Sequence, residues 1–318
     1  MENSNNEINN KMFDLVIIGG GPAGITAAIY ASRKQINTLF ITDSMQGQSL
    51  FSPKIENWIG EVEISGLDLS VKLKNHLENN LNNYIQVTEG EKACSVKKKE
   101  NFYEICLGEL TYRTKAVLIT TGMTRKKINA KNAEKFERKG INYCAICDGP
   151  LYKEKIVTVI GGGNSAFESA SQLLAYCEKV YLITKGDSFN ADPITVDSII
   201  NHEKLEIIKN AEATEIHGDL MVNGLKYLDK VGGDKKEIKT DGIFVEIGSK
   251  PATEFVSDLL DLDDENKIKI DPWTQRTSQE GVWAAGDCTN ILYNQNNIAV
   301  GDAIVAIENI YQWMIQNK

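Results

Sequence analysis

Two segments of the chain combine an apolar strand pattern, a glycine-rich turn and a helical pattern, and this combination limits the possible folds more than any other feature. The first segment starts with FDLVIIGG at residue 13 and ends with the apolar run TLFIT at residues 38–42. The second starts with KIVTVIGGG at residue 155 and ends with VYLIT at residues 180–184. A strand, a tight glycine turn, a helix and a strand form a βαβ unit. The sequence therefore predicts two related nucleotide-binding folds in one chain.

The later strands predict how the two folds are arranged along the chain. Each βαβ unit is followed by short, charge-punctuated strands and then by an apolar strand that ends in glycine, at Gly122 and at Gly248. The remaining segment is short for another complete domain. It contains one strand, GVWAAGD, and a helical pattern from about residue 297 to 313. We therefore predict an α/β protein of two Rossmann-like domains, with 125–250 inserted between the two parts of the first domain, 12–124 and 251–318.

Composition excludes several classes of protein. A chain of 318 residues has room for about two domains. Its net charge of −9, from 35 basic and 44 acidic residues, disfavours a nucleic-acid-binding protein. No apolar run reaches the roughly 18 residues that span a bilayer, and the Asn-rich residues 1–11 read as a disordered tail rather than a secretory signal. Six cysteines are too few for a secreted disulfide scaffold, so we expect a cytoplasmic protein without membrane attachment.

The first glycine motif fits the pattern G-x-G-x-x-G. Its first glycine allows a tight turn, its second lets a pyrophosphate approach the backbone, and its third lets the helix pack closely on the strand. The helix N-terminus then offers unpaired N–H groups to the phosphates. Asp43 ends the next strand, where an acidic residue would bind the ribose hydroxyls; a solvated turn residue fits this position equally well. The candidate binding residues of the motif are Gly19, Gly21, Pro22, Ala23 and Gly24.

The second glycine motif fits G-x-G-x-x-A and implies a second dinucleotide. Its candidate residues are Gly161, Gly163, Asn164, Ser165 and Ala166. The following strand ends in TKGD at residues 184–187, without the acid that favours NADH or the arginines that favour NADPH. Lys185 either meets a 2′-phosphate as a point charge or is a solvated surface lysine. Two dinucleotide sites in one chain indicate a flavin and a nicotinamide between which a hydride passes.

The remaining chemical motif is the pair Cys144 and Cys147 with C-x-x-C spacing, followed by Asp148. It fits a redox-active dithiol, half of a zinc site, or two small buried thiols. The zinc reading needs two further ligands, and the sequence has no second C-x-x-C and no H-x₃₋₅-H pair. We favour the redox dithiol, and we predict no metal site. The other cysteines lack such spacing and are interpreted as small buried thiols: Cys94, Cys106, Cys177 and Cys288.

Five motifs occur in a fixed order along the chain: GGGPAG at residues 19–24, IENW at 55–58, CAICDGP at 144–150, VIGGGNSA at 159–166 and AAGDC at 284–288. With these motifs the chain resembles the low-molecular-weight thioredoxin reductases over nearly its whole length from residue 13. The core of the flavoprotein subunit of alkyl hydroperoxide reductase is also similar. That subunit carries an additional N-terminal thioredoxin-like region, and we expect no direct equivalent because only a short polar tail precedes residue 13.

The resemblance implies that the first domain binds FAD and that the inserted, NAD(P)-binding-like domain carries the C-x-x-C. The first glycine motif would hold the FAD pyrophosphate, and the second would face NADPH or NADH. Gln295 would begin the C-terminal helix beside the flavin ring, where the positive end of the helix dipole stabilises the anionic reduced form. Other parts of FAD would contact Asp43, Gln48, Asn57, Gly286 and Asp287.

The resemblance also implies a path for the electrons, from a donor to FAD and then to the Cys144–Cys147 disulfide, with Cys147 nearest the flavin. Cys144 would attack the disulfide of thioredoxin or a similar small redox protein, and Cys147 would resolve the mixed disulfide. Asp148 would donate or accept the accompanying proton, unless it is only a turn residue before the Gly-Pro pair. The family also implies a homodimer, and two linkers around an inserted domain fit a hinge between two arrangements.

The sequence departs from the family at the donor site. These reductases usually show a His-Arg-Arg-Asp run followed by another Arg, whereas this chain has TKGD at residues 184–187 and Asn190 at the last position. The loss of bidentate phosphate donors weakens NADPH binding, so NADPH, NADH and ferredoxin all remain candidate donors. Three functions stay open: a disulfide reductase, a flavin-dependent dithiol oxidase that uses oxygen, and a non-catalytic dinucleotide sensor. A sensor would not need Cys144 and Cys147.

Overall fold

The computed structural model describes residues 12–45, 47–52 and 54–317, and the chain divides into two compact units. Unit 1 contains the chain up to Thr124 and from Lys250 onward, and unit 2 is Arg125–Ser249. The two linkers between the units are extended, since β7 (Met123–Arg125) pairs with β16 (Ser249–Pro251). The predicted disordered tail, residues 1–11, lies outside the described residues.

Unit 1 is built on one sheet with the strand order β3-β2-β1-β6-β5-β4, and β17 pairs with β6. The pairs among β1, β2, β3, β6 and β17 are parallel, whereas β4 pairs with β5 and β5 with β6 antiparallel. The carboxyl ends of the parallel strands therefore meet at one edge, where open α/β sheets bind their ligands. The strands are β1 (Met12–Ile18), β2 (Thr38–Thr42), β3 (Ile85–Glu89), β4 (Ala93–Lys98), β5 (Tyr103–Leu107), β6 (Leu110–Ile119) and β17 (Val282–Ala284).

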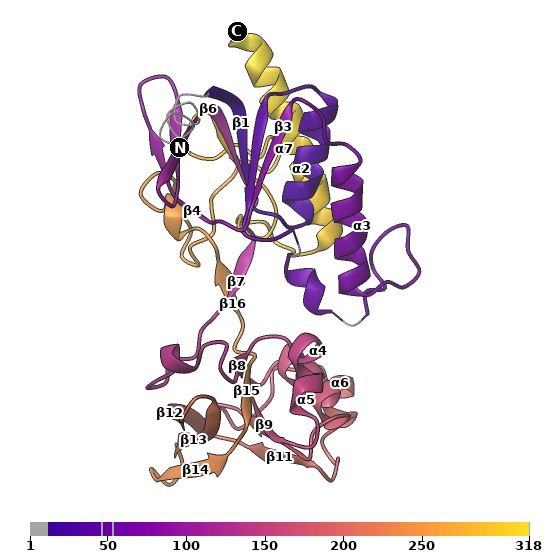
Figure 1. Ribbon diagram of the computed structural model, residues 1–318, viewed down its shortest axis with the longest axis vertical. Coiled ribbons are helices and arrows are strands. Elements are labelled where there is room, and N and C mark those ends of the chain that lie inside the picture. The colour runs from indigo at the N-terminus through magenta and orange to yellow at the C-terminus, as the bar shows by residue number, and fades with distance from the viewer. Residues whose placement is uncertain (1–11, 46, 53, 318) are drawn as a thin grey trace. The chain divides into compact units, whose positions relative to one another are not determined.

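Three helices cover one face of this sheet (Figure 1): α2 (Pro22–Arg33), α3 (Gly66–Glu78) and α7 (Asn296–Gln316). Small buried residues let α2 and α7 pack closely, among them Ala27 and Ala31 of α2 and Ala303 and Ala306 of α7. By length and composition α7 is also apolar enough to cross a membrane, which the search for apolar runs did not anticipate. In the structure, the small-residue face of α7 belongs to the core of unit 1.

Unit 2 contains a parallel sheet with the order β11-β10-β9-β15-β8 and a separate antiparallel sheet, β12-β13-β14. The helix that follows the second glycine motif buries Ala166, Ala170, Leu173 and Leu174, which recur at helical spacing. The elements are β8 (Ile141–Asn142), β9 (Ile156–Ile160), β10 (Lys179–Ile183), β11 (Leu205–Ile208), β12 (Ala211–Gly218), β13 (Val222–Asp229), β14 (Lys235–Lys239), β15 (Gly242–Val245), α4 (Ala145–Asp148), α5 (Asn164–Leu174) and α6 (Pro193–Asp197). Short 3₁₀ turns occupy Gln48–Phe51, Glu134–Phe136, Gly149–Tyr152 and Glu254–Val256.

The predicted strands are present, but two of them end earlier than their apolar runs. The strands β2 and β9 match the predicted apolar runs, whereas β6 and β15 stop three residues before Gly122 and Gly248. Both glycines have positive φ, 60° and 87°, so the chain turns into each linker at a residue that tolerates this conformation. The sequence patterns did not predict that β12, β13 and β14 form their own sheet.

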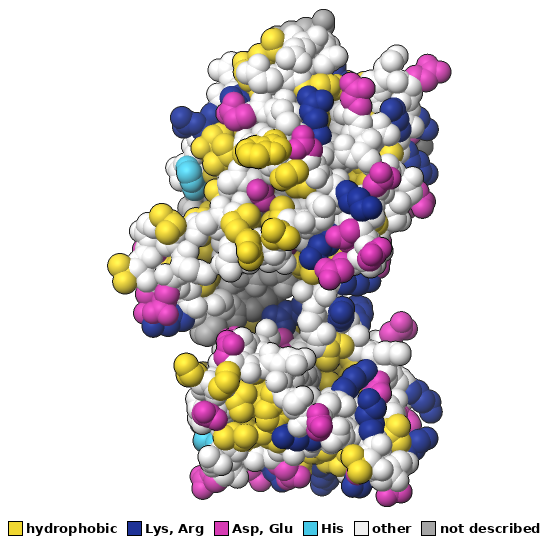
Figure 2. All heavy atoms as spheres, turned by 180° about the vertical axis from the view of Figure 1, so that it is seen from behind, with side chains coloured by type: hydrophobic (Ala, Val, Ile, Leu, Met, Phe, Trp, Pro, Cys, Tyr) yellow, Lys and Arg dark blue, Asp and Glu magenta, His cyan; other side chains and the backbone are white. Residues whose placement is uncertain are grey.

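The surface carries charges of both signs. On the face shown in Figure 2, Lys and Arg side chains alternate with Asp and Glu side chains on both units, and neither sign covers a continuous area. Hydrophobic side chains also reach the surface of unit 1, and the most exposed include Trp273, Leu292 and Tyr293. This face therefore lacks the continuous basic surface that a nucleic-acid-binding protein presents.

Candidate active site

The first glycine turn joins β1 to α2 and shows why each glycine is required. A Cβ on Gly19, where φ is 117°, would lie 2.4 Å from the Thr120 carbonyl oxygen. A Cβ on Gly24 would lie 1.7 Å from the Gly19 carbonyl oxygen. By contrast, a Cβ on Gly21 would meet no atom closer than 4.0 Å, the Cα of Gly47. Gly19 and Gly24 are therefore needed for packing, and Gly21 leaves its open side to a ligand.

A cavity of about 330 Å³ opens at this turn, at the carboxyl ends of β1, β2 and β6. Eight of the candidate FAD residues line it: Gly19, Gly21, Pro22, Ala23, Asp43, Gln48, Gly286 and Asp287. Gly24 lies beneath the turn, against the Gly19 carbonyl group, and does not line the cavity. The sequence patterns missed further lining residues, which include Glu91, Lys92, Ala93, Thr121 and Asn296. They belong to segments without a motif, although the apolar run that ends at Gly122 pointed to this edge of the sheet.

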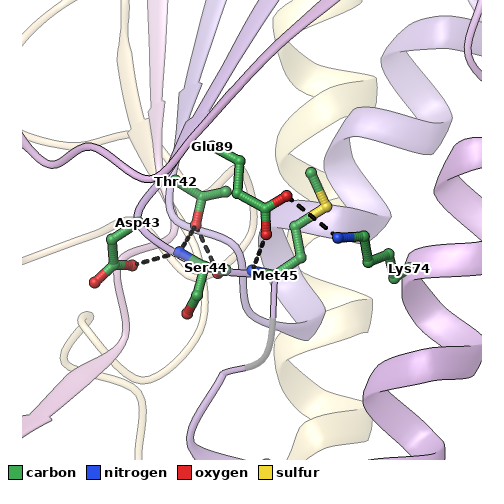
Figure 3. Close-up of polar contacts among 6 residues, drawn as sticks. All are labelled: Thr42, Asp43, Ser44, Met45, Lys74 and Glu89. Atoms are coloured by element: carbon green, nitrogen blue, oxygen red, sulfur yellow. Dashed lines mark hydrogen bonds and ion pairs between the residues drawn. The ribbon is translucent and has the colours of Figure 1, made fainter.

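The turn after β2 holds Asp43, which lines the cavity. The Asp43 carboxylate accepts a hydrogen bond from the Ser44 N–H at 3.0 Å (Figure 3). It also lies 3.1 Å from the Lys92 ammonium group. Next to it, Glu89 accepts from the Met45 N–H at 3.3 Å. These contacts fix the backbone of the turn and hold the Asp43 carboxylate at the wall of the cavity.

The start of α7 is tied to the segment that follows the Asp43 turn. Asn57 donates from its side-chain amide to Gln295 Oε1 at 2.9 Å, and the Asn297 amide donates to the Asn57 carbonyl oxygen at 2.6 Å. Neither Asn57 nor Gln295 lines the cavity, but Asn296 does, and it accepts a hydrogen bond from Ser49 Oγ at 2.7 Å. The two predicted residues therefore position the helix N-terminus beside the cavity.

Asp287 is a half-buried acid in the wall of the cavity. Burial raises the pKa of its carboxyl group, and the nearby Lys267 opposes this shift. A half-buried carboxylate is stabilised by hydroxyl groups of a ligand that donate hydrogen bonds to it. The open face of Gly21, the carboxylates of Asp43 and Asp287 and the N-terminus of α7 together fit a polyhydroxylated dinucleotide such as FAD.

The second glycine turn joins β9 to α5 in unit 2 and repeats this geometry. A Cβ on Gly161, where φ is 153°, would lie 2.2 Å from the Glu246 carbonyl oxygen, whereas nothing lies within 4 Å of a Cβ on Gly163. Ala166 replaces the third glycine and is fully buried. The Asn164 amide donates to Asp192 Oδ2 at 2.8 Å, and the Asp192 N–H donates to Asn164 Oδ1 at 2.6 Å. The side chain of Asn164 is thus already bound to the loop that follows β10.

The proposed phosphate-binding lysine of unit 2 is also paired. Lys185 Nζ lies 2.6 Å from Glu212 Oε1, and this contact lowers the pKa of Glu212. Thr184, which precedes it, is buried beneath the turn, since its Oγ1 would be 2.7 Å from a Cβ on Gly162. A lysine that is paired with a carboxylate of the same chain attracts a 2′-phosphate less strongly than an unpaired lysine does.

A buried polar cluster at the end of β15 was not predicted. Glu246 is nearly fully buried, and it pairs with Arg125 Nη1 at 2.5 Å and accepts from Ser169 Oγ at 2.8 Å. Burial raises the pKa of Glu246, and Arg125 and then Ser169 oppose the shift. The cluster fixes the linker strand β7 to the central sheet of unit 2. The acid in the otherwise apolar run GIFVEIG was the signal that the sequence offered.

Cys144 and Cys147 form a disulfide at the start of α4, with a Cα–Cα distance of 5.4 Å. Cys144 is buried and its sulfur accepts the Cys147 N–H at 3.0 Å, whereas Cys147 is exposed. Such a hydrogen bond stabilises a Cys144 thiolate once the disulfide is reduced. Burial raises the pKa of the Asp148 carboxyl group next to the pair. A carboxyl group with a raised pKa is better suited to exchange protons near neutral pH.

The other four cysteines behave in two ways. Cys177 and Cys288 are buried free thiols, and burial raises the pKa of each to about 11, which confirms their interpretation. The same interpretation was wrong for Cys94 and Cys106, which form a disulfide between β4 and β5. A separation of 12 residues carries no motif, and only the antiparallel register brings the two cysteines together. Within the described part of the chain, no group of three or more His, Cys, Asp or Glu residues is arranged to hold a metal ion.

Comparison with known proteins identifies a family and its members. The model of the pyridine nucleotide-disulphide oxidoreductase family matches residues 13–308. A protein named NADH dehydrogenase from Bacillus subtilis is 34% identical over 96% of this chain and 59% of its own length. An Escherichia coli subunit of alkyl hydroperoxide reductase is 34% identical over the same shares of the two chains. The chain therefore spans about three fifths of the length of these curated relatives.

Solved structures match the chain over almost their full length. The thioredoxin reductase of Lactococcus lactis in its FR conformation is 31% identical, with a TM-score of 0.83 over 96% of this chain and 99% of that one. The thioredoxin reductase of T. acidophilum is 36% identical, with a TM-score of 0.81 over 96% and 100%. A ferredoxin-flavin thioredoxin reductase from Clostridium acetobutylicum is 31% identical, with a TM-score of 0.53 over 96% and 99%. These similarities confirm the predicted fold class and the resemblance.

Proposed function

Because the chain belongs to the pyridine nucleotide-disulphide oxidoreductase family, we propose that it is an FAD-dependent disulfide reductase acting on thioredoxin or a similar small redox protein. The observation that carries the proposal is the pairing of two features in one chain. Unit 1 has an open glycine turn at a cavity, and unit 2 has the Cys144–Cys147 disulfide, of which Cys147 is exposed. Similarity to thioredoxin reductases over nearly the whole chain supports this substrate class.

We assign the cofactor to unit 1, which contains the predicted domain 12–124 and 251–318. The turn at Gly21 would hold the pyrophosphate, Asp43 the ribose, and Asp287 the hydroxyl groups nearer the flavin ring. Asn57 and Gln295 would keep the N-terminus of α7 directed toward the flavin. When bound, FAD supplies a carrier that accepts two electrons from a donor and delivers them to a disulfide.

The disulfide in the inserted domain, 125–250, would carry out the exchange with the partner. In the reduced form, the Cys144 thiolate, stabilised by the Cys147 N–H, would attack one sulfur of the partner disulfide. Cys144 is buried in this structure, so the step requires a conformational change that exposes it. A mixed disulfide forms, and the other partner sulfur leaves as a thiolate and takes a proton. Cys147 then attacks Cys144, which restores the internal disulfide and releases the second partner thiol. Asp148, with its raised pKa, would hold or supply the proton.

The proposal includes more than one candidate for the electron donor. The open turn at Gly163 supports a nicotinamide dinucleotide in unit 2. The Lys185–Glu212 pair and the missing arginines disfavour a tight NADPH site and favour NADH or a protein donor such as ferredoxin. An anaerobic titration with NADPH, NADH and reduced ferredoxin in turn, followed by flavin absorbance, decides among them. If none of the three donors bleaches the flavin absorbance, the proposal of a reductase is wrong. Fast reoxidation of the reduced flavin by air would favour a dithiol oxidase.

The assignment of the dithiol is tested by Cys144→Ser. We expect this variant to lose disulfide reduction by at least about 10³-fold, because the attacking thiolate is gone, while flavin reduction by the donor is kept. Cys177→Ser serves as the matched control, because Cys177 is a buried free thiol outside the proposed reaction. Retained activity of Cys144→Ser with thioredoxin would refute the assignment.

We further propose that the protein is a cytoplasmic homodimer with α7 as a core helix. The buried small-residue face of α7 supports the core role, and the exposed Trp273, Leu292 and Tyr293 of unit 1 support an interface between copies. Sedimentation of the FAD-loaded protein should give twice the mass of one chain. A single-chain mass at micromolar concentration would contradict the dimer.

A further inference from the structure

The disulfide between Cys94 and Cys106 faces away from the core. On β5, Tyr103, Ile105 and Leu107 are buried in the core of unit 1, so Cys106 between them points to the opposite side. Cys94 is exposed on β4, the edge strand of the sheet (Figure 1). The disulfide therefore adds nothing to the packed core, and a thiol in solution can reach it.

This disulfide also lies directly beside the nucleotide cavity of unit 1. Glu91, Lys92 and Ala93, the three residues before Cys94, all line the cavity. Lys92 forms an ion pair with Asp43, the proposed ribose-binding acid, at 3.1 Å. Whatever holds the start of β4 in place therefore holds part of the cavity rim.

The pairing of β4 with β5 is irregular at this point. Ala93 pairs with Leu107 and Ser95 pairs with Cys106, so Cys94 is the extra residue of a β-bulge. A bulge on an edge strand is weakly held by backbone hydrogen bonds, because the ladder is interrupted there. The covalent bond to Cys106 is thus the strongest constraint on the segment that leads into the cavity rim.

We propose that Cys94–Cys106 is a second thiol–disulfide exchange site, which small dithiol proteins reduce and whose reduction loosens the cavity rim and speeds the release of FAD. The inference rests on the proposed function, because the reduced partner of that reaction is the dithiol that reaches this site. The product of the enzyme would then act back on its cofactor.

The exchange is balanced in electrons and protons. A thiolate of the dithiol protein attacks Cys94 Sγ, the exposed sulfur, and the bond between Cys94 and Cys106 breaks. Cys106 leaves as a thiolate and takes a proton. The second thiol of the dithiol protein then closes its own disulfide, and Cys94 is released as a thiol. The site gains two electrons and two protons, and the dithiol protein loses the same number.

The test uses the FAD-loaded Cys144→Ser/Cys147→Ser protein, in which only this disulfide can respond. Reduced thioredoxin and, separately, dithiothreitol are added under native conditions. Maleimide tagging with peptide mass mapping follows the thiols, and FAD fluorescence after dilution follows cofactor release. We expect Cys94 and Cys106 to become tagged. We also expect FAD release to become about threefold faster or more, which corresponds to less than a tenfold loss of FAD affinity. Buried Cys177 should stay untagged.

The matched variant is Cys94→Ser/Cys106→Ser in the same background. It should release FAD at the fast rate from the start and show no response to either reductant. A disulfide that stays closed until the protein unfolds would overturn the proposal, and so would tagging without a change in FAD release. Because the test protein lacks Cys144 and Cys147, neither result depends on the reductase activity, which is assayed separately in the wild type. If the matched variant does not fold, the tagging and release measurements on the Cys144→Ser/Cys147→Ser protein, with and without reductant, decide.

Discussion

The two glycine turns of this chain have nearly the same backbone but different surroundings. Gly19 packs on the Thr120 carbonyl group in unit 1, and Gly161 packs on the Glu246 carbonyl group in unit 2. In unit 1 the turn opens on a cavity with the acids Asp43 and Asp287 in its wall, and the cation that pairs with Asp43, Lys92, lines the same cavity. In unit 2 the side chains that would meet a second nucleotide, Asn164 and Lys185, are held by carboxylates of the chain itself, Asp192 and Glu212.

This difference separates what a glycine motif requires from what a ligand requires. The first glycine of each turn is needed because a Cβ would collide with the carbonyl oxygen of the residue that follows the neighbouring strand, whether or not a nucleotide binds. Only the second glycine, Gly21 or Gly163, faces open space. The choice of ligand then depends on side chains that come after the second strand, where the two units differ.

Among the variants that test this difference between the two glycine turns, we expect the largest effect, a loss of FAD affinity, from Gly21→Val. Gly21 has an extended backbone, φ −77° and ψ −174°, which valine adopts without strain, so the new side chain fills ligand space and leaves the fold intact. We expect FAD affinity to fall by about a hundredfold or more, close to 3 kcal/mol. Titration of the apo-protein with FAD measures this loss, and the melting temperature of the apo-protein checks the fold.

Gly163→Val is the matched control in unit 2. Its backbone is also extended, φ −99° and ψ −178°, and the residue belongs to the compact unit that does not contain the FAD cavity. We expect FAD affinity to be unchanged and nicotinamide binding to weaken. Tight FAD binding by Gly21→Val, or loss of FAD by Gly163→Val, would reverse the assignment of the two units.

Much of the fold followed from periodic patterns in the sequence. The runs TLFIT and IVTVI became β2 and β9 residue for residue, because a buried parallel strand is apolar throughout. The early ends of β6 and β15 and the separate sheet β12–β14 were not predictable in the same way. They depend on positive φ at Gly122 and Gly248 and on pairing between polar strands, which leave no hydrophobic period.

The parts of the candidate site that a sequence motif defines were predictable. The parts that depend on how strands pair in the folded protein were not. The glycines and Asp43 were found from spacing alone, since each has a fixed distance from the end of a strand. Lys92 lines the same cavity from an edge strand and has no motif. Cys94 and Cys106 were misread because their contact exists only through the pairing of β4 with β5, 12 residues apart.

A smaller effect, on the free energy of unfolding, is expected from Arg125→Met. This variant tests the Arg125–Glu246 pair, which lies beside the second glycine turn. The variant leaves Glu246 buried without its close cation, and breaking a buried pair in this way costs about 3 kcal/mol at neutral pH. The folded-state pKa of Glu246, already raised by burial, rises further, so the folded state binds a proton more readily than the unfolded state. The deficit should therefore be small at a pH below the raised folded-state pKa of Glu246 in the wild type, and grow as the pH rises above that pKa.

Urea unfolding of the wild type and Arg125→Met at a series of pH values measures this deficit. Lys126→Met is the matched control, because Lys126 is exposed and its loss should change the free energy of unfolding by no more than about 0.5 kcal/mol. The double variant Arg125→Met/Glu246→Leu should recover most of the stability, since no charge is left buried. A deficit that is equal at all pH values would show that Arg125 acts through packing and not through Glu246.

The smallest effect concerns the side chains that distinguish the donor. Glu212→Gln keeps the shape of the residue but frees the Lys185 ammonium group from its carboxylate partner. We expect NADPH to gain roughly two- to fivefold over NADH, as the release of an exposed ion pair allows, and the gain to vanish in high salt. Glu206→Gln is the control, because Glu206 pairs with Lys179 at 2.6 Å and this pair lies at the opposite end of β10. The contrary outcome is an unchanged preference between NADPH and NADH in Glu212→Gln, with slow flavin reduction by both nucleotides. It would mean that the glycine turn of unit 2 serves packing alone and that a protein donates the electrons.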